Sequence, residues 1–251
     1  MMSSQPKNHT DFILSPLTKI VTDVTSASVG MGDGIETYPA CDYLMQSVFL
    51  KMTGAQEQKM KCICWELATH DYEYRYDRYN NPRGQLGECS TFKEKQTVYK
   101  DLFGQIIKHG DPQYNQNSID KGKILNDTTT SINSTFSDTN LVTWAQNSFI
   151  SFTSIWSSID TRFFIGDKDN LFPKVQNSYS LKEIYSNHLY KNRNRIAHNT
   201  KSYQQNLPTL KTLMDENYKY ENYFVYFAVL VLIDNIFIHL YKDYLKVIED
   251  V

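Results

Sequence analysis

Arg193, Asn194 and His198 are residue types that together could cut RNA without a metal ion. Such a cleavage needs a group that takes the proton from the ribose 2′-hydroxyl, a cation that stabilises the phosphorane, and a proton for the leaving 5′-oxygen. Histidine suits proton transfer because its unperturbed pKa, roughly 6.5, lies near neutral pH. Arginine stays charged and presents a fork that matches two phosphate oxygens. Asparagine can hold a phosphate oxygen or orient the imidazole without adding charge.

The spacing of Arg193 and His198 restricts how they could act together. On a continuous helix, residues five apart are separated by about 500°, so their side chains lie roughly 140° apart around the axis. A kink or a helix start between the two residues could bring them together. A symmetric dimer that places two motif helices side by side could do the same.

The segment 190–199 resembles the motif of the HEPN superfamily in its form Arg-Asn-x-x-x-His. Ile196 and Ala197, directly before His198, give the Arg-Asn-x-hydrophobic-Ala-His texture that is common in that superfamily. Some of its subfamilies carry a tyrosine two residues after the histidine. Here that position is Thr200, and Tyr203 has the wrong spacing, which disfavours a tyrosine-dependent reaction such as nucleotide transfer.

The resemblance implies a fold and an activity. Many HEPN proteins are metal-independent ribonucleases that act as dimers in toxin–antitoxin, anti-phage and RNA-processing systems. It implies a core of four or five helices, an RNA cleft shared across a two-fold interface, and 2′,3′-cyclic phosphate products. His198 would transfer protons, Arg193 would bind phosphate and Asn194 would orient the reacting groups.

Basic residues surround the motif although the whole chain is close to charge balance. The chain has 26 basic and 28 acidic residues among 251, which argues against a protein that coats nucleic acid along its whole surface. A local basic cleft is compatible with that balance. The candidate substrate-binding residues are Lys191, Arg195 and Lys201, with Lys182 nearby, and Arg195 could instead be a structural ion-pair partner.

Other groups that could do chemistry favour structural interpretations. Cys41, Cys62, Cys64 and Cys89 lack zinc-like spacing and are expected to be buried or inert thiols in a reducing compartment. We predict no metal or cofactor.

Three further candidates lie on or beside helical segments. Glu66 and His70, one turn apart, form at most a weak metal pair. The arginines and aromatics of 72–79 could stack bases, but the interleaved acids favour a salt-bridged helix surface. His188 either lines the same cleft as His198 or lies at the surface.

Apolar spacing and capping signals predict a chain of helices and no comparable strand pattern. Capping boxes start two of these helices, at Thr91–Glu94 and Ser180–Glu183, and the second helix leads into the motif. The expected helices cover 14–25, 39–54 ending at Gly54, 55–79, 92–109, 141–164, 181 onward, 209–216 and 220–248. We predict an all-α, HEPN-like bundle in a single domain, 1–251, with extra N-terminal helices and the motif region at 180–203.

Two segments are polar enough to predict irregular structure. Residues 1–10 are expected to be disordered. Residues 111–140 are dense in Asn, Ser, Thr and Asp, and we interpret them as a long polar loop or insertion, with a recognition loop as the alternative.

The segment 223–240 is hydrophobic enough to raise the question of a membrane span. Asp234 and Asn235 interrupt it, and burying that pair in lipid would be costly. A core or dimer-interface helix is favoured, so we predict a cytoplasmic protein without a membrane partner. Asp234 and Asn235 are expected to fix helix pairing or dimer register, and Asp234 could alternatively pair with a motif arginine.

The sequence thus predicts a metal-independent endoribonuclease of HEPN type. Its expected partners are an RNA substrate such as tRNA or mRNA, a second copy of the chain, and an antitoxin or other regulatory protein. The alternative is a non-catalytic helical module that binds RNA or a protein and keeps the motif as a structural ion pair. A third hypothesis is a membrane-associated effector that uses the C-terminal helix.

Overall fold

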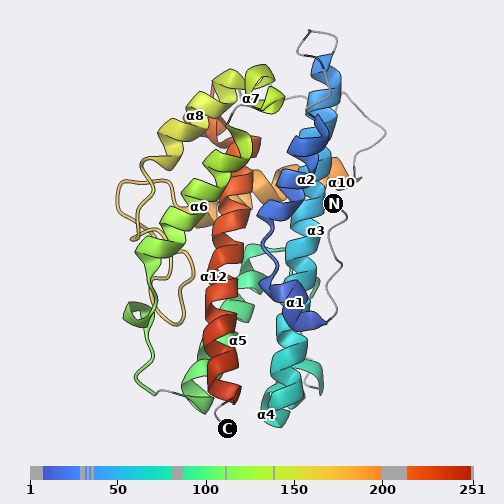
Figure 1. Ribbon diagram of the computed structural model, residues 1–251. Coiled ribbons are helices and arrows are strands. Elements are labelled where there is room, and N and C mark those ends of the chain that lie inside the picture. Colours follow the sequence, from blue (N-terminus) through green and yellow to red (C-terminus); the bar gives the residue numbers. More distant parts are fainter. Residues whose placement is uncertain are drawn as a thin grey trace.

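A long apolar helix forms the axis of the computed structural model, which describes residues 8–28, 32, 34, 37–80, 87–110, 112–137, 139–198 and 214–249. This helix, α12 (Tyr223–Glu249), packs against α3 (Tyr38–His70), α5 (Phe92–His109) and α6 (Lys121–Phe136), as Figure 1 shows. Among the described residues none lies in a β-strand, and a single bridge joins Asp167 to Asn170. The predicted all-α class is confirmed.

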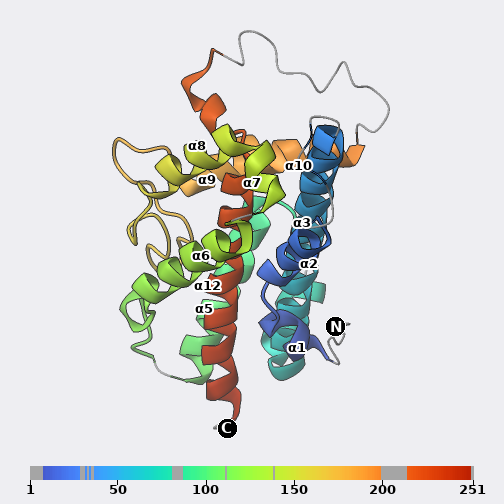
Figure 2. The same cartoon turned by 45° about the horizontal axis from the view of Figure 1, so that its top comes forward.

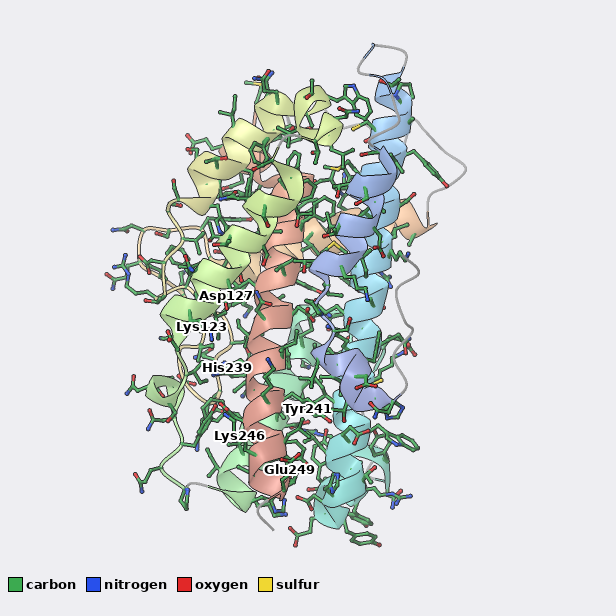
Figure 3. All side chains as sticks on the ribbon, in the orientation of Figure 1. Lys123, Asp127, His239, Tyr241, Lys246 and Glu249 are labelled. Atoms are coloured by element: carbon green, nitrogen blue, oxygen red, sulfur yellow. The ribbon has the colours of Figure 1, made fainter. Side chains whose placement is uncertain are left out.

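Helix α12 is buried on nearly every side in its first half. Every residue from Phe224 to Ile233 is at most 1% exposed. A helix that is apolar all round must be enclosed, because only neighbouring helices can cover every face. Polar residues appear toward its C-terminal end, where Figure 3 labels His239, Lys246 and Glu249.

By length and composition alone, α12 could also cross a membrane. Of its most apolar 18-residue window, 78% is buried inside the bundle. The central helix of a soluble bundle has the same character, so these properties do not identify a membrane span.

A buried ion pair joins α3 to α12. Lys59 Nζ lies 2.6 Å from Asp234 Oδ1, and the two side chains are 3% and 1% exposed. Lys59 also donates to the carbonyl of Ser15, and the backbone N–H of Leu17 donates to Asp234 Oδ2 at 2.8 Å. Burial lowers the pKa of Lys59 and raises that of Asp234, while each charge partly restores the other. The alternative that Asp234 pairs with a motif arginine is therefore wrong.

Asn235, the other polar residue of that pair, links α12 to α6. Its Nδ2 donates to Thr128 Oγ1 at 2.9 Å. Asp234 and Asn235 therefore both fix helix pairing within the chain, as one of the sequence hypotheses expected.

Helix α3 is one helix of 33 residues, so the predicted break at Gly54 is wrong. A glycine inside a helix costs only about 1 kcal/mol relative to alanine. Packing around it offsets that cost, because Met52 and Gln56 are fully buried and Gln56 Nε2 donates to the Leu230 carbonyl at 2.9 Å. The helix ends at His70 and not at residue 79, because Asp71 is extended and caps α4 (Tyr72–Arg75). A π-helical turn, η2 (Tyr76–Asn80), follows.

The predicted polar loop over 111–140 is wrong for most of its length. Residues 121–136 form α6, which is capped by Asp120. Its buried residues recur every fourth position, which is the spacing of one helix face: Ile124, Thr128, Ile132 and Phe136. A narrow apolar stripe was enough to order a helix whose other faces are polar. A short 3₁₀ helix, η3 (Gln116–Ser118), precedes it.

The N-terminal segment is helical from His9, so the predicted disorder is wrong for residues 8–10, and residues 1–7 lie outside the described part. Asn8 caps α1 (His9–Leu14), and α2 (Thr18–Ser28) follows. Both helices pack on α3.

The helix expected over 141–164 is shorter and divided. It consists of α7 (Asn140–Trp144) and α8 (Gln146–Trp156). The chain then runs irregularly to Ser180, although Phe163 and Phe164 are buried. The short helix expected over 209–216 lies mostly outside the described residues; a 3₁₀ helix, η6 (Glu216–Tyr220), precedes α12.

The Lys59–Asp234 pair yields a prediction for stability. Lys59→Met or Asp234→Leu alone should lower the free energy of unfolding by about 3–5 kcal/mol, because each leaves one buried charge without its partner. The double variant should recover most of that loss. Urea unfolding of the four proteins measures the cycle, and the exposed Arg162–Asp160 pair, 2.7 Å apart, is the control with an expected coupling below about 1 kcal/mol. Additive losses at Lys59 and Asp234 would contradict this account.

Candidate functional site

The motif lies on a helix that crosses the bundle. This helix consists of α9 (Leu181–Glu183), a π-helical turn η4 (Ile184–Leu189) and α10 (Tyr190–His198). Figures 1 and 2 show it running transversely to α3 and α12. It begins with the predicted capping box, in which Ser180 Oγ accepts from the Glu183 N–H at 3.2 Å and Glu183 Oε2 accepts from the Ser180 N–H at 2.9 Å.

The backbone between Arg193 and His198 is regular α-helix. The irregular turn lies before the motif and not within it, so the kink considered as one way of bringing the two residues together is absent. The two positions therefore lie roughly 140° apart around the helix. His198 is the last residue of α10, and its side chain, together with Lys201 and the rest of 199–213, lies outside the described residues.

Arg193 is held against α3 by Glu57. Its Nη2 donates to both carboxylate oxygens of Glu57, at 3.1 and 3.2 Å, and its Nη1 donates to Asn194 Oδ1 at 3.1 Å. The side chains of Arg193 and Glu57 are 24% and 13% exposed. The structure therefore brings Arg193 and Asn194 together and fixes the orientation of the guanidinium from α3.

Arg195 points to a different partner. Its Nη2 donates to Glu221 Oε2 at 3.3 Å, and its Nε is buried with no hydrogen-bond partner among the described residues. Arg195 was considered as a phosphate contact or as a structural ion-pair partner. The structure contains the ion pair, with Glu221. Lys191, the other described candidate, is exposed, and no ion pair involving it occurs within the described ranges.

Glu221 is the centre of a hydrogen-bond network that includes His188. His188 Nδ1 lies 3.1 Å from Glu221 Oε1 and its Nε2 lies 3.0 Å from the Tyr179 hydroxyl, while Tyr226 donates its hydroxyl to Glu221 at 2.8 Å. Burial alone would raise the pKa of Glu221, but His188, Tyr226 and Arg195 hold it below its usual value. His188 is 8% exposed, so the expectation of a surface residue is wrong: it is buried by its two partners.

Sequence reasoning missed Glu57 and a second buried lysine beside it. Lys95 is 1% exposed, donates to the Cys89 carbonyl at 2.8 Å, and lies 5.8 Å from the centre of the Tyr185 ring. Burial lowers its pKa to about 8, and the negative charge of Glu57 partly opposes this shift. Glu57, Arg193 and Lys95 thus form a charged cluster contributed by α3, α10 and α5.

Both missed residues left a signal in the sequence. Lys95 lies three residues after Phe92 and three before Val98, on the stripe that α5 buries. Glu57 lies four residues after buried Thr53 and three before buried Met60. A charged residue on a buried stripe requires a partner, although spacing alone does not identify that partner.

The remaining candidates are engaged structurally. Glu66 Oε1 lies 2.9 Å from His9 Nδ1, and in the described ranges no group of three His, Cys, Asp or Glu residues could hold a metal. Arg78 donates to Asp101 at 2.8 Å, as expected for a salt-bridged surface, whereas Tyr72, Tyr76 and Tyr79 are exposed.

The four cysteines are free, as expected. Cys41, Cys64 and Cys89 are buried, and Cys62 is partly buried. Burial raises the pKa of Cys41 and Cys89 to about 11 and that of Cys64 to about 12, so these thiols are protonated and unreactive at neutral pH.

The lowered pKa of Lys95 yields a prediction for alkaline pH. Between its folded pKa of about 8 and its ordinary 10.5, the unfolded chain binds a proton that the folded chain does not. Stability contributed by this group therefore rises with pH across that window. The free energy of unfolding of wild type should rise relative to Lys95→Met by roughly 1–3 kcal/mol from pH 8 to pH 10.5. Exposed Lys93→Met is the control, and parallel curves for wild type and Lys95→Met would contradict the prediction.

Compared with protein-family models, characterised proteins and solved structures, this chain matches none of them. The similarity to the HEPN superfamily is therefore carried by the motif residues alone.

Proposed function

We propose that this protein is a metal-independent endoribonuclease of HEPN type that acts as a homodimer. The observation that supports the proposal is the paired geometry of Arg193 and Asn194 on α10, with Arg193 anchored by Glu57. A fixed guanidinium reduces the reorganisation needed when charge develops on a phosphorane. His198, at the end of the same helix, is the proton-transfer group of the proposed reaction.

The proposed chemistry follows from these residue types. His198 accepts the 2′-hydroxyl proton as the oxygen attacks the adjacent phosphorus, and Arg193 stabilises the phosphorane. The bond to the 5′-oxygen then breaks, that oxygen takes a proton from the protonated His198 of the other copy in the dimer, and a 2′,3′-cyclic phosphate remains. Positions 193 and 198 lie on different faces of one α10, so one copy need not hold the complete site. In a dimer with a two-fold axis, His198 of one copy would be the base and His198 of the other the acid.

Uncontrolled cleavage of cellular RNA would harm the cell that makes such an enzyme, and this indicates its biological role. An enzyme that cuts tRNA or mRNA must be restrained, so we propose a toxin or anti-phage effector in the cytoplasm, controlled by an antitoxin or another regulatory protein.

A second candidate function is a non-catalytic helical module that binds RNA or a protein. The ion pairs of the two motif arginines favour it, because Arg193 and Arg195 both have carboxylate partners within the chain. In this alternative the motif holds α10 in place and performs no reaction.

The first test is cleavage of end-labelled tRNA and mRNA by purified protein in EDTA. Wild type should leave 2′,3′-cyclic phosphate ends, and His198→Ala should be slower by about 100-fold or more, since proton transfer contributes at least that much. Both proteins must first be shown to be folded dimers. Equal cleavage by both would overturn the assignment of His198, and a wild type without activity would favour the binding module.

Arg193→Ala separates the two functions. In the enzyme, this variant should remain a folded dimer and lose about 100-fold or more in cleavage rate, as expected for a lost transition-state donor. In the binding module it should unfold or dissociate, because there the role of the motif arginine is to hold α10 in place. Thermal unfolding and light scattering measure this, with Arg162→Ala as control, since Arg162 is 75% exposed and its ion-pair partner among the described residues is nearby Asp160.

A further inference from the structure

A groove of about 910 Å³ lies beside the motif helix. One wall comes from the start of α5, a second from the segment 169–174, and the third from α9 and η4. It ends at Tyr190, the first residue of α10. Asn194 follows Tyr190 by four positions, which places both on one face of the helix. The groove therefore ends one helical turn before Asn194, on the same face of the helix.

The groove carries an excess of positive charge. Four lysines line it, namely Lys93, Lys100, Lys174 and Lys182, against two carboxylates. Both carboxylates are already engaged: Asp169 lies 3.3 Å from Lys100 Nζ, and Glu183 accepts from the backbone and hydroxyl of Ser180.

Three of the lysines are free to contact an anion in the groove. Lys93, Lys174 and Lys182 are exposed, and none has an ion-pair partner within the described part of the chain. Hydrogen bonds from Ser180, and then the charges of Lys174 and Lys182, hold the pKa of Glu183 below its usual value. Lys174 and Lys182 therefore both add positive potential at the same place, beside Glu183. This favours binding of an anion with several charges.

Aromatic rings accompany the charge. Phe92 and Phe172 are buried and stack with ring centres 5.5 Å apart, and Lys182 Nζ lies 5.9 Å from the Phe92 ring centre. Tyr190, partly exposed, lies where the groove meets α10. A basic groove with an accessible aromatic ring is the arrangement that binds single-stranded nucleic acid, and Tyr190 is the ring that a base could reach here. Its volume is on the scale of a small-molecule site, about 300–1,000 Å³, which suits a few nucleotides rather than a duplex.

A second hollow continues the groove away from α10. It measures about 620 Å³ and shares Lys174 and Glu183 with the first. Its wall carries Tyr179 and Tyr220, stacked with ring centres 4.7 Å apart. Charged and aromatic groups therefore extend along one track that ends at Tyr190, one helical turn before Asn194.

We infer that this track binds single-stranded RNA and guides it to the Arg193–Asn194 pair, with Lys93, Lys174 and Lys182 contacting successive phosphates. This inference rests on the proposed ribonuclease function and assigns its substrate-binding surface. None of the three lysines belongs to the catalytic set, so binding can be tested apart from cleavage.

The test measures binding of a short fluorescein-labelled oligouridylate by anisotropy at several salt concentrations. His198→Ala is the parent, so that no RNA is cut. In that background we compare K93E/K174E/K182E with the charge-matched control K19E/K123E/K242E, whose lysines are exposed on α2, α6 and α12 (Lys123 is labelled in Figure 3). The groove variant should bind at least about tenfold more weakly. Its slope of log affinity against log salt should be lower by about 2, at about 0.7 per lost phosphate contact. The control should stay close to the parent.

Three results would overturn the inference. They are equal effects of the two triple variants, no RNA binding by the parent, and equally groove-dependent binding of duplex RNA or heparin, which would identify a general polyanion surface. Thermal unfolding establishes that both triple variants are folded.

Cleavage by protein with His198 intact distinguishes this inference from the proposed function. If wild type cuts no RNA but the parent binds it through the groove, the ribonuclease proposal fails and the groove assignment stands. If K93E/K174E/K182E cuts subsaturating RNA as fast as wild type, the groove assignment fails and the ribonuclease stands.

Discussion

The buried Lys59–Asp234 pair is the constraint on which the positions of the other charged groups depend. Two charges removed from water are tolerated only with good geometry and further hydrogen bonds, and here the Leu17 N–H and the Ser15 carbonyl complete the set. This fixes the rotation and register of α3 against α12 and ties the α1–α2 connection to both. Glu57 precedes Lys59 by two residues, so the same register aims Glu57 at α10.

The cluster at Glu57 combines two cations with one carboxylate in a poorly solvated place. Arg193 holds the carboxylate directly, whereas Lys95 is fully buried and close enough for Glu57 to oppose the fall in its pKa. Arginine suits the more exposed position because it keeps its charge, and lysine suits the buried one because it can lose a proton. The cluster therefore joins α3, α5 and α10 at the point where the motif helix crosses the bundle.

Local signals predicted the parts of the fold that depend on local physics. Both capping boxes form, and the apolar C-terminal helix is central. Two of the failures have a common cause, which is that tertiary packing outweighed local preference. It carried α3 through Gly54 and ordered α6 on a stripe of four residues. For the site, Arg193 and Asn194 were predicted, but Glu57 lies 136 residues away in the chain. The spacing of residues in the sequence shows that a buried charge needs a partner. It does not identify which of many distant residues is that partner.

The carboxylate beside Arg193 has a consequence for the proposed enzyme. A phosphate approaching this arginine also meets the negative charge of Glu57, which weakens ground-state binding there. A phosphorane carries more negative charge than the phosphate it comes from, so it gains more from the fixed guanidinium. Glu57 opposes the phosphorane as well, so its contribution to the proposed reaction is to hold the guanidinium in place and reduce the reorganisation needed as charge develops. Binding energy must then come from elsewhere. Lys93, Lys174 and Lys182 of the groove, which have no carboxylate partners among the described residues, are placed to supply it.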